Sequence, residues 1–386
     1  MKMPEASARK IQIALPCTGE DEAAAAREPI LSGWLTQGPK VAAFEKAFAE
    51  RHGVERALAT TSCTTALHLA LAAIGVGPGD EVIVPAFTWV ATANVVLYCG
   101  ATPVFADVDP RTFNIDVNHA ARRVTGRTKA IVPVHLFGLC ADIDTLRATI
   151  PGHVAIIEDA ACAAGASYRG RPAGGLGDMA AFSFHPRKSI TTGEGGMLTT
   201  NNAALADVAD RLRNHGASMS EEQRHAEPKP YLLPEFNLLG FNYRMTDIQG
   251  AVGLVQLGKL DRFVEERAKW AAWYYNELGN LDWLRLPAEP EEGNHAWQSF
   301  VVRVDPDRAP LSRNAIMERL QARGISTRPG THAVHMLGLY AEKFGFRPDD
   351  YPGARDCDAN SMAIPLHNRM TAEDYSYVAE AIRDLV

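Results

Sequence analysis

Short apolar runs alternate with helix-forming stretches through the first half of the chain. The runs are RALAT, EVIVP, TPVFADV, KAIVPVHLFG and VAIIEDA, and the segments between them carry apolar residues at helical spacing. This alternation is typical of a mostly parallel sheet with helices on both of its faces. The sequence therefore predicts an α/β fold whose large domain has three layers, α/β/α.

The pattern changes further along the chain. Two more strand-like runs, MAAFSFH and GGMLTT, bracket the loop PRKSITTGE, and helix 203–213 follows. Apolar residues then trace one long helix over 245–277. We expect a large domain over residues 1–255 and a smaller α+β domain over 256–386, on which the first residues of the chain can also pack.

Composition excludes several classes of protein. The 386 residues are 46% hydrophobic but contain no apolar run long enough to cross a membrane. A net charge of −7 without a Lys/Arg-rich run argues against nucleic acid as a partner. Six cysteines without CxxC spacing suggest neither a disulfide framework nor a zinc site. The N-terminus has no secretory h-region, so we expect a soluble, cytoplasmic protein.

Polar residues follow the predicted strands at the edge where α/β proteins bind ligands. In TSCTTALHLAL, Ser62, Cys63 and Thr64 stand before a helix, where free backbone amides can bind phosphate, although a simple N-cap is the alternative. In FTWVATAN, Trp89 is placed either to lie on an aromatic ring or to pack in a core or interface.

Two further segments carry ionisable groups. The strand VAIIEDA delivers Glu158 and Asp159 at its end, each as a helix cap or as a functional carboxylate. The loop in FSFHPRKSITTGEGG carries Lys188 among hydroxyl and glycine residues, an unusual setting for a side chain that normally lies on solvated surfaces. A shielded loop of this kind suits a Schiff-base lysine. A fifth segment, GFNYRMTDIQGA, leads into the long helix.

Together these parts match the needs of pyridoxal 5′-phosphate (PLP) chemistry. A phosphate-binding helix end, a stacking aromatic, a carboxylate for the pyridine nitrogen and a lysine for the aldehyde occur in that order. The chain resembles the DegT/StrS-type sugar aminotransferases of the fold-type I PLP class. The resemblance rests on SGWLTQGPKVAAFEKAF, SCTTALHLAL, IVPAFTWVATAN, VFADVDP, IEDAACAAGA, FSFHPRKSITTGEGG, GFNYRMTDIQGAVG and IPLHNRMTAED.

The resemblance implies a role for each site residue. Lys188 would carry the cofactor as a Schiff base, Asp159 would hold the pyridine nitrogen protonated, and Trp89 would stack on the ring. The phosphate contacts it implies are Cys63, Thr64, Ser183 and, from a second subunit, Asn242. Because Asn242 would come from a second subunit, the resemblance also implies a homodimer.

The chain departs from the family pattern at two cysteines. Cys63 replaces a glycine found in many relatives, which a backbone contact to phosphate would tolerate. Cys162 stands where relatives usually carry Gln or His against the phenolic oxygen of the cofactor, and a thiol is a weak partner for that contact. His332 and His335 have a spacing that metal ligands also show, but without a third ligand we expect no metal and assign them to the surface or to substrate contact.

We therefore expect an aminotransferase that cycles between PLP and its amine form, PMP. The amino donor would be glutamate or glutamine, and the acceptor a keto-deoxy sugar on a nucleotide. Two alternatives are a 3-keto sugar, a free keto-sugar or a cyclitol as the acceptor, and a non-catalytic PLP-binding regulatory protein. A PLP sugar dehydratase is a third, but dehydratases of that type replace the Schiff-base lysine with histidine, and Lys188 is intact here. The ending GEGG of the lysine loop resembles relatives that act on a 4-keto-6-deoxyhexose, whereas GDGG is more frequent in those that act at C3.

Overall fold

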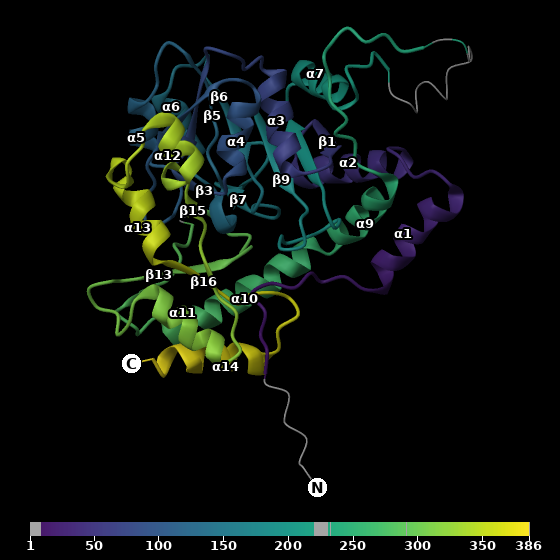
Figure 1. Cartoon of the computed structure of the whole chain (residues 1–386). Helices are drawn as coiled ribbons and strands as arrows, with labels where there is room; N and C mark the ends of the chain where they lie inside the picture. The colour runs from purple at the N-terminus through teal and green to yellow at the C-terminus, as the bar shows by residue number, and fades with distance from the viewer. Residues whose placement is uncertain (1–8, 220–230, 232, 291, 386) are drawn as a thin grey trace.

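A seven-stranded sheet forms the centre of the larger part of the molecule (Figure 1). The computed structural model describes residues 9–219, 231, 233–290 and 292–385. The strand order is β1-β10-β9-β6-β5-β2-β4, and within this sheet β10 alone runs against its neighbours. The strands are β1 (Arg56–Thr60), β2 (Glu81–Pro85), β4 (Thr102–Ala106), β5 (Thr128–Ile131), β6 (Ala155–Asp159), β9 (Met179–Ser183) and β10 (Gly196–Thr200). The predicted mostly parallel sheet is confirmed.

Helices cover both faces of this sheet. One face packs against α3 (Cys63–Ala73), α4 (Ala91–Tyr98) and α7 (Ala203–Arg213). The other face packs against α2 (Pro39–His52), α5 (Val117–Arg122) and α6 (Ile143–Thr149). The arrangement is the three-layer α/β/α architecture that the alternating sequence predicts.

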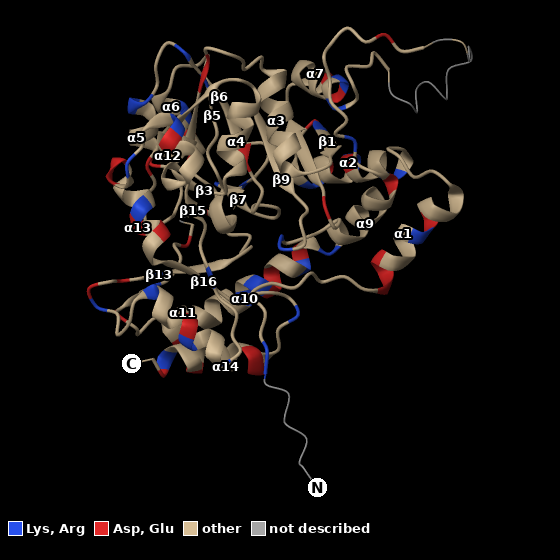
Figure 2. Cartoon of the chain, in the orientation of Figure 1, with Lys and Arg blue, Asp and Glu red and all other residues tan. Residues whose placement is uncertain are grey.

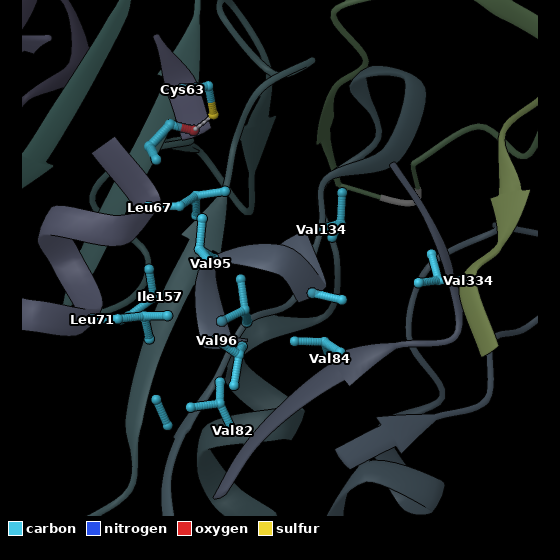
Figure 3. Close-up of a cluster of buried hydrophobic side chains, with 14 of the residues drawn as sticks. Cys63, Leu67, Leu71, Val82, Val84, Val95, Val96, Val134, Ile157 and Val334 are labelled. Carbon is cyan, nitrogen blue, oxygen red and sulfur yellow. Dashed lines mark hydrogen bonds between the residues drawn. The ribbon is translucent and has the colours of Figure 1, made fainter. Parts of the chain in front are cut away.

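Successive residues of each strand join opposite layers, because side chains alternate across a sheet. In β2, Val82 and Val84 pack in the cluster beneath α3 and α4, whereas Ile83 packs against α5 and α6. Figure 3 shows the first cluster, where Leu67 and Val95 meet the strand residues. Full burial of such an aliphatic side chain stabilises the fold by roughly 1.5–3 kcal/mol.

The expected single long helix over 245–277 is wrong, because it consists of two helices. They are α9 (Asp247–Gly258) and α10 (Leu260–Leu278), and Lys259 ends one and begins the next. The Lys259 amide donates to Gln256 O at 3.0 Å, a tightened last turn. Glycine at 258 weakens the helix there by about 1 kcal/mol relative to alanine. The boundary near residue 255 remains a prediction, and the observed break lies close to it.

A second, four-stranded sheet of order β11-β13-β16-β14 lies in the C-terminal region, residues 260–385, and packs with α10, α11 and α14 (Figure 1). The N-terminal segment joins this region, because the Ile11 amide donates to Gly324 O at 2.8 Å. The elements are β11 (Leu284–Arg285), β13 (Phe300–Val304), α11 (Arg313–Ala322), β14 (Arg328–Pro329), β16 (Ser361–Ile364) and α14 (Ala372–Arg383).

The remaining elements are mostly short. They are α1 (Glu20–Ser32), β3 (Phe87–Thr88), β7 (Ser167–Tyr168), β8 (Arg171–Pro172), β12 (Gly293–Asn294), β15 (His332–Ala333), α12 (Gly338–Phe344), α13 (Pro352–Asn360) and the 3₁₀ turns Leu136–Gly138, Val334–Met336 and Pro348–Asp350. Charged residues of both signs are distributed over the helices and loops in Figure 2. Among the described residues, no helix combines the length and apolarity that crossing a bilayer requires.

Candidate active site

The N-terminus of α3 presents free backbone amides next to the carboxyl end of β1. Ser62 is the N-cap: its Oγ accepts from the Thr65 amide at 3.2 Å, and Thr65 Oγ1 accepts from the Ser62 amide at 3.0 Å. The amides of Cys63 and Thr64 make no hydrogen bond with the described residues. The capping role therefore applies to Ser62, while Cys63 and Thr64 keep two donors at the positive end of the helix dipole, a suitable site for phosphate.

The Cys63 side chain points away from these amides, toward the end of β6. Its Sγ lies 4.0 Å from Asp159 Oδ1 and 3.5 Å from Ala181 O. Burial, together with the nearby Asp159 carboxylate, raises the pKa of the Cys63 thiol. Cys63 thus stays an uncharged thiol, and an anion at the helix end would meet its backbone rather than its sulfur.

Asp159 is buried at the end of β6, with 5% of its surface exposed. Its Oδ2 accepts from Thr92 Oγ1 at 2.8 Å, and its Oδ1 accepts from the Ala161 amide at 3.2 Å. Burial raises the pKa of Asp159, and the two hydrogen bonds oppose this only in part. Within the described residues no cationic side chain forms a salt bridge with it. A buried carboxylate without a cationic partner is stabilised by a nearby positive charge. The protonated pyridine nitrogen of PLP would supply that charge, so the residues fit this cofactor.

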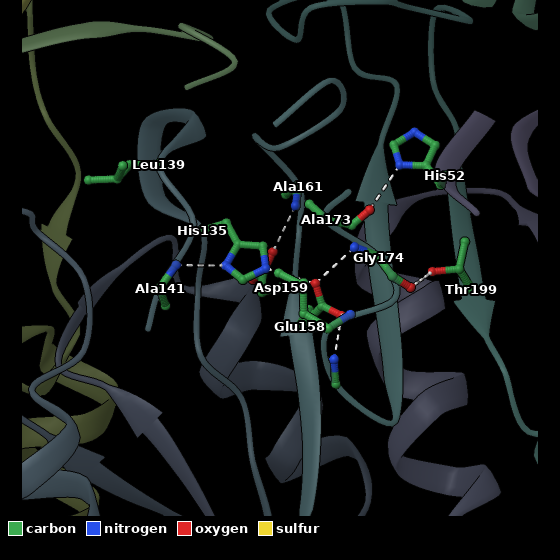
Figure 4. Close-up of polar contacts among 12 residues, drawn as sticks. His52, His135, Leu139, Ala141, Glu158, Asp159, Ala161, Ala173, Gly174 and Thr199 are labelled. Carbon is green, nitrogen blue, oxygen red and sulfur yellow. Dashed lines mark hydrogen bonds and ion pairs between the residues drawn. The ribbon is translucent and has the colours of Figure 1, made fainter. Parts of the chain in front are cut away.

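Side chains alternate along a strand, so Glu158 faces the opposite side of β6 from Asp159, and Figure 4 shows its polar contacts. Its carboxylate accepts from the amides of Gly174, Leu176 and Gly177 at 2.7–2.8 Å. It also contacts His135 Nε2 at 2.8 Å, while His135 Nδ1 accepts from the Ala141 amide at 3.1 Å. Nε2 therefore carries the proton and donates to Glu158. With every oxygen occupied, Glu158 has no free group for chemistry, and of the two acids only Asp159 faces the site.

Lys188 lies in the loop between β9 and β10, residues 184–195. Its Nζ contacts Cys162 Sγ at 3.1 Å. Burial alone would lower the pKa of Lys188, but the neighbouring Cys162, Cys63 and Asp159 together raise it. The lysine amine, both thiols and the Asp159 carboxylate are therefore close enough to interact electrostatically and form one cluster.

Helix α9 holds the far end of the lysine loop. Gln249 Nε2 donates to Glu194 O at 2.7 Å, and Gln256 Oε1 accepts from the Thr191 amide at 3.2 Å. The Gln256 amide group also donates to Cys17 O at 3.0 Å, which ties the N-terminal segment to the same place. The loop is therefore anchored by side chains far apart in the sequence.

Trp89 follows β3 and is 61% exposed, so a face of its ring is free to stack. Strand β3 pairs with β15, which sets His332 beside it with ring centroids 5.7 Å apart. The assignment of His335 to the surface or to substrate contact is wrong, because this residue is fully buried and its Nε2 lies 3.2 Å from Pro348 O. Only His332 of this pair is accessible.

Ser183 and Asn242 are not joined to Lys188 by a direct side-chain contact. Ser183 is buried at the end of β9, where its Oγ accepts from the His185 amide at 3.4 Å. Asn242 is exposed, and the next residue, Tyr243, accepts from the Thr61 amide at 3.0 Å beside the phosphate-site loop. Both phosphate contacts remain predictions.

Thr92 is a site residue that reading the sequence missed. It lies in the first turn of α4, three residues after Trp89, and also contacts Thr88 Oγ1 at 3.0 Å. The available signal was the pair of hydroxyl residues, Thr88 and Thr92, on either side of Trp89 in FTWVATAN.

Comparisons with known proteins identify the family of the chain. The profile of the DegT/DnrJ/EryC1/StrS aminotransferase family matches residues 16–383. The chain is 40% identical over 374 residues to the spore coat polysaccharide biosynthesis protein SpsC of Bacillus subtilis, covering 96% of both chains. It is 41% identical over 376 residues to the GDP-perosamine synthase of Caulobacter vibrioides, covering 97% of both.

Solved structures share the whole fold. The putative sugar aminotransferase Spr1654 of Streptococcus pneumoniae, in its PMP form, superposes with a TM-score of 0.90 at 28% identity over 97% of this chain and 99% of that one. Its PLP form gives the same TM-score. The fold is therefore that of the fold-type I PLP enzymes. The chain belongs to the DegT/DnrJ/EryC1/StrS aminotransferase family and is a PLP-dependent sugar aminotransferase.

Proposed function

We propose that this enzyme transfers an amino group from glutamate or glutamine to a nucleotide-linked 4-keto-6-deoxyhexose. The observation that carries the proposal is the intact lysine loop HPRKSITTGEGG, whose Lys188 amine lies in one cluster with buried Asp159. The GDP-perosamine synthase, whose named product is linked to GDP, supports a nucleotide-linked sugar. We place the enzyme in the cytoplasm.

The site residues would hold the cofactor as follows. The Cys63 and Thr64 amides, with Ser183, would bind its phosphate, and Trp89 would lie on its ring. Asp159 would hold a proton on the pyridine nitrogen. When bound, PLP supplies an electron sink for the bonds at the amino-bearing carbon.

Lys188 has two tasks in this proposal. Its Nζ would hold the cofactor in the resting enzyme and would move a proton at the reacting carbon during the reaction. Borohydride reduction of the loaded enzyme, followed by peptide mapping, should find the pyridoxyl group on Lys188. A label on another lysine would remove this assignment.

The sugar is tested with the PMP form of the enzyme. We expect a nucleotide-linked 4-keto-6-deoxy sugar to restore the absorbance of the PLP form, with a much higher kcat/KM than its 3-keto isomer. A preference for the 3-keto sugar would reject the C4 assignment. Turnover of only a free keto-sugar or cyclitol would reject the nucleotide. Cofactor binding without turnover of any amino donor would support a regulatory protein instead.

A homodimer would complete the phosphate site, with Asn242 reaching into the neighbouring subunit. The exposed apolar residues Phe236, Leu238 and Leu239 precede Asn242 and supply a surface for such a contact. Sedimentation analysis should find a dimer, and Asn242→Ala should weaken PLP binding. A fully active monomer would contradict this arrangement.

A further inference from the structure

A side chain of the C-terminal region holds the near end of the lysine loop. Gln298 Nε2 donates to Arg187 O at 2.8 Å, and Arg187 immediately precedes Lys188. The Gln298 carbonyl oxygen, Oε1, accepts from Ser299 Oγ at 3.1 Å, which orients the amide with its nitrogen toward the loop. The contact joins segments 111 residues apart in the sequence.

The turn that carries Gln298 is locked in place. Trp297 is buried and has a φ of +48°, a strained value for a residue with a bulky side chain. Its ring stacks on His295 with centroids 3.9 Å apart. The Ala296 amide donates to Gly138 O at 2.9 Å, and a Cβ at Gly138 would lie 3.0 Å from Trp297 N. Strain of this kind persists only where the surroundings determine the conformation.

Arg267 of α10 holds the carbonyls of this turn. Its Nη1 lies 3.2 Å from both Trp297 O and Gln298 O, and its Nε donates to Asn368 Oδ1 at 2.8 Å. Only 5% of Arg267 is exposed, and within the described residues no carboxylate forms a salt bridge with it. Burial lowers the pKa of Arg267 to about 10, so the group stays charged at neutral pH. The buried guanidinium of Arg267 thus donates to two backbone carbonyls and to one side-chain amide oxygen.

We infer that Gln298 is a positioning residue for Lys188, and that Arg267 fixes the turn from which Gln298 acts. The path runs from the Arg267 guanidinium to the carbonyl of Gln298, from the Gln298 amide to the carbonyl of Arg187, and along one peptide to Lys188. The inference rests on the proposed role of Lys188. Because misplacement of a reacting group by about 1 Å can cost roughly a hundredfold in rate, a single backbone anchor beside the lysine is enough to matter.

The test replaces Gln298 with Glu, which keeps its shape but removes the N–H donor. We expect Gln298→Glu to lower the single-turnover rate with glutamate by about tenfold or more. Most of this loss should lie in the maximal rate, and little in the glutamate concentration that gives half of it. The pH titration of the bound cofactor's absorbance should shift as well, because the lysine amine moves relative to the ring. Gln298→Lys, which supplies an N–H donor again, should recover most of both. Gln321→Glu, an exposed position on α11, is the matched control.

The outcomes separate positioning from a general loss of stability. If Gln298→Glu matches the wild type in both the half-reaction and the titration, the inference is wrong. If Gln298→Glu and Gln298→Lys are equally impaired and have equally lowered melting temperatures, Gln298 serves only the fold. The half-reaction uses no sugar, so a wrong sugar assignment would leave this result unaffected. If glutamate is not the donor of the wild type, glutamine takes its place in the same assay, and a wild type that reacts with neither would reject the proposed function itself.

Discussion

The amine of Lys188 lies 3.1 Å from the thiol of Cys162. In the relatives that the chain resembles, Gln or His usually takes the place of this cysteine and contacts the cofactor's phenolic oxygen. In this chain the Cys162 side chain contacts the Lys188 amine. Cys162 therefore acts on the charge state of Lys188, because its proximity is one of the causes that keep the pKa of Lys188 above its ordinary value despite burial.

Cys162→Ala should make Lys188 easier to deprotonate. Burial lowers the pKa of Lys188, whereas Cys162 raises it, so removing the thiol should lower this pKa. At pH 8, below that pKa, each unit by which the pKa falls gives about ten times more neutral amine. We expect the second-order rate of PLP loading, followed by absorbance, to rise by about two- to tenfold. Cys99→Ala, a thiol outside the site, should load at the wild-type rate.

Asp159→Asn should keep the fold and bind PLP but lose most of the half-reaction rate. An opposite charge at contact distance shifts a pKa by roughly 1–3 units, so loss of the carboxylate should slow the reaction with glutamate about ten- to a thousandfold. Thr92→Val is a milder comparison, because it removes one hydrogen bond and leaves the charge. Stopped-flow absorbance measures both. A near-normal rate in Asp159→Asn would remove Asp159 from the chemistry.

Glu158→Gln should destabilise the protein without acting on the chemistry. Burial alone would raise the pKa of Glu158, but hydrogen bonds from His135, Gly177 and Gly174 hold it below its ordinary value. In the glutamine variant the side-chain NH2 would face one of the N–H donors that Glu158 accepts from. The free energy of unfolding should therefore fall by about 3 kcal/mol or more, as for other buried charged sites. Urea unfolding should show the loss, while the half-reaction rate at low temperature stays near normal. Exposed Glu55→Gln is the control.

His52→Phe should reduce the acid sensitivity of the fold. His52 is buried against Phe48, its Nδ1 lies 2.9 Å from Ala173 O, and burial lowers its pKa from 6.5 to about 4. The unfolded state binds an extra proton between these values, so stability falls as the pH drops from 6.5 toward 4. This histidine should account for roughly 2–3 kcal/mol of the loss between pH 7 and pH 4.5.

The comparison uses urea unfolding at those two pH values. In His52→Phe the difference in unfolding free energy should be smaller than in the wild type by that amount. His153→Phe, at an exposed position, should leave the difference unchanged. An equal pH dependence in His52→Phe and the wild type would show that other groups cause the acid loss.

The layers of the fold were predictable because each strand and helix carries its own periodicity. The break at Lys259 was not, since a single glycine within an apolar helical pattern is a weak local signal and the direction of α10 is set by packing in the C-terminal region. The small strand β15 was also missed, because its two residues are fixed by pairing with β3 rather than by their own pattern.

The sequence predicted which residue types form the site, but not toward which face of the sheet their side chains point. Glu158 and Asp159 looked equivalent in the sequence. Strand alternation implies that only one of them can face α3, and deciding which requires knowing which layer covers each face. Gln298 and Arg267 gave no local signal, because their partners lie far away in the chain.

The reversed direction of β10 has an evolutionary consequence. Since β9 and β10 are adjacent and antiparallel, the loop 184–195 is the tip of a hairpin whose two ends are fixed by neighbouring strands. Insertions or exchanges at this tip leave the order of the sheet unchanged, whereas a crossover between parallel strands would have to carry a covering helix with it. Selection on the length and composition of this tip can therefore act separately from selection for stability, which acts on the strands beneath it.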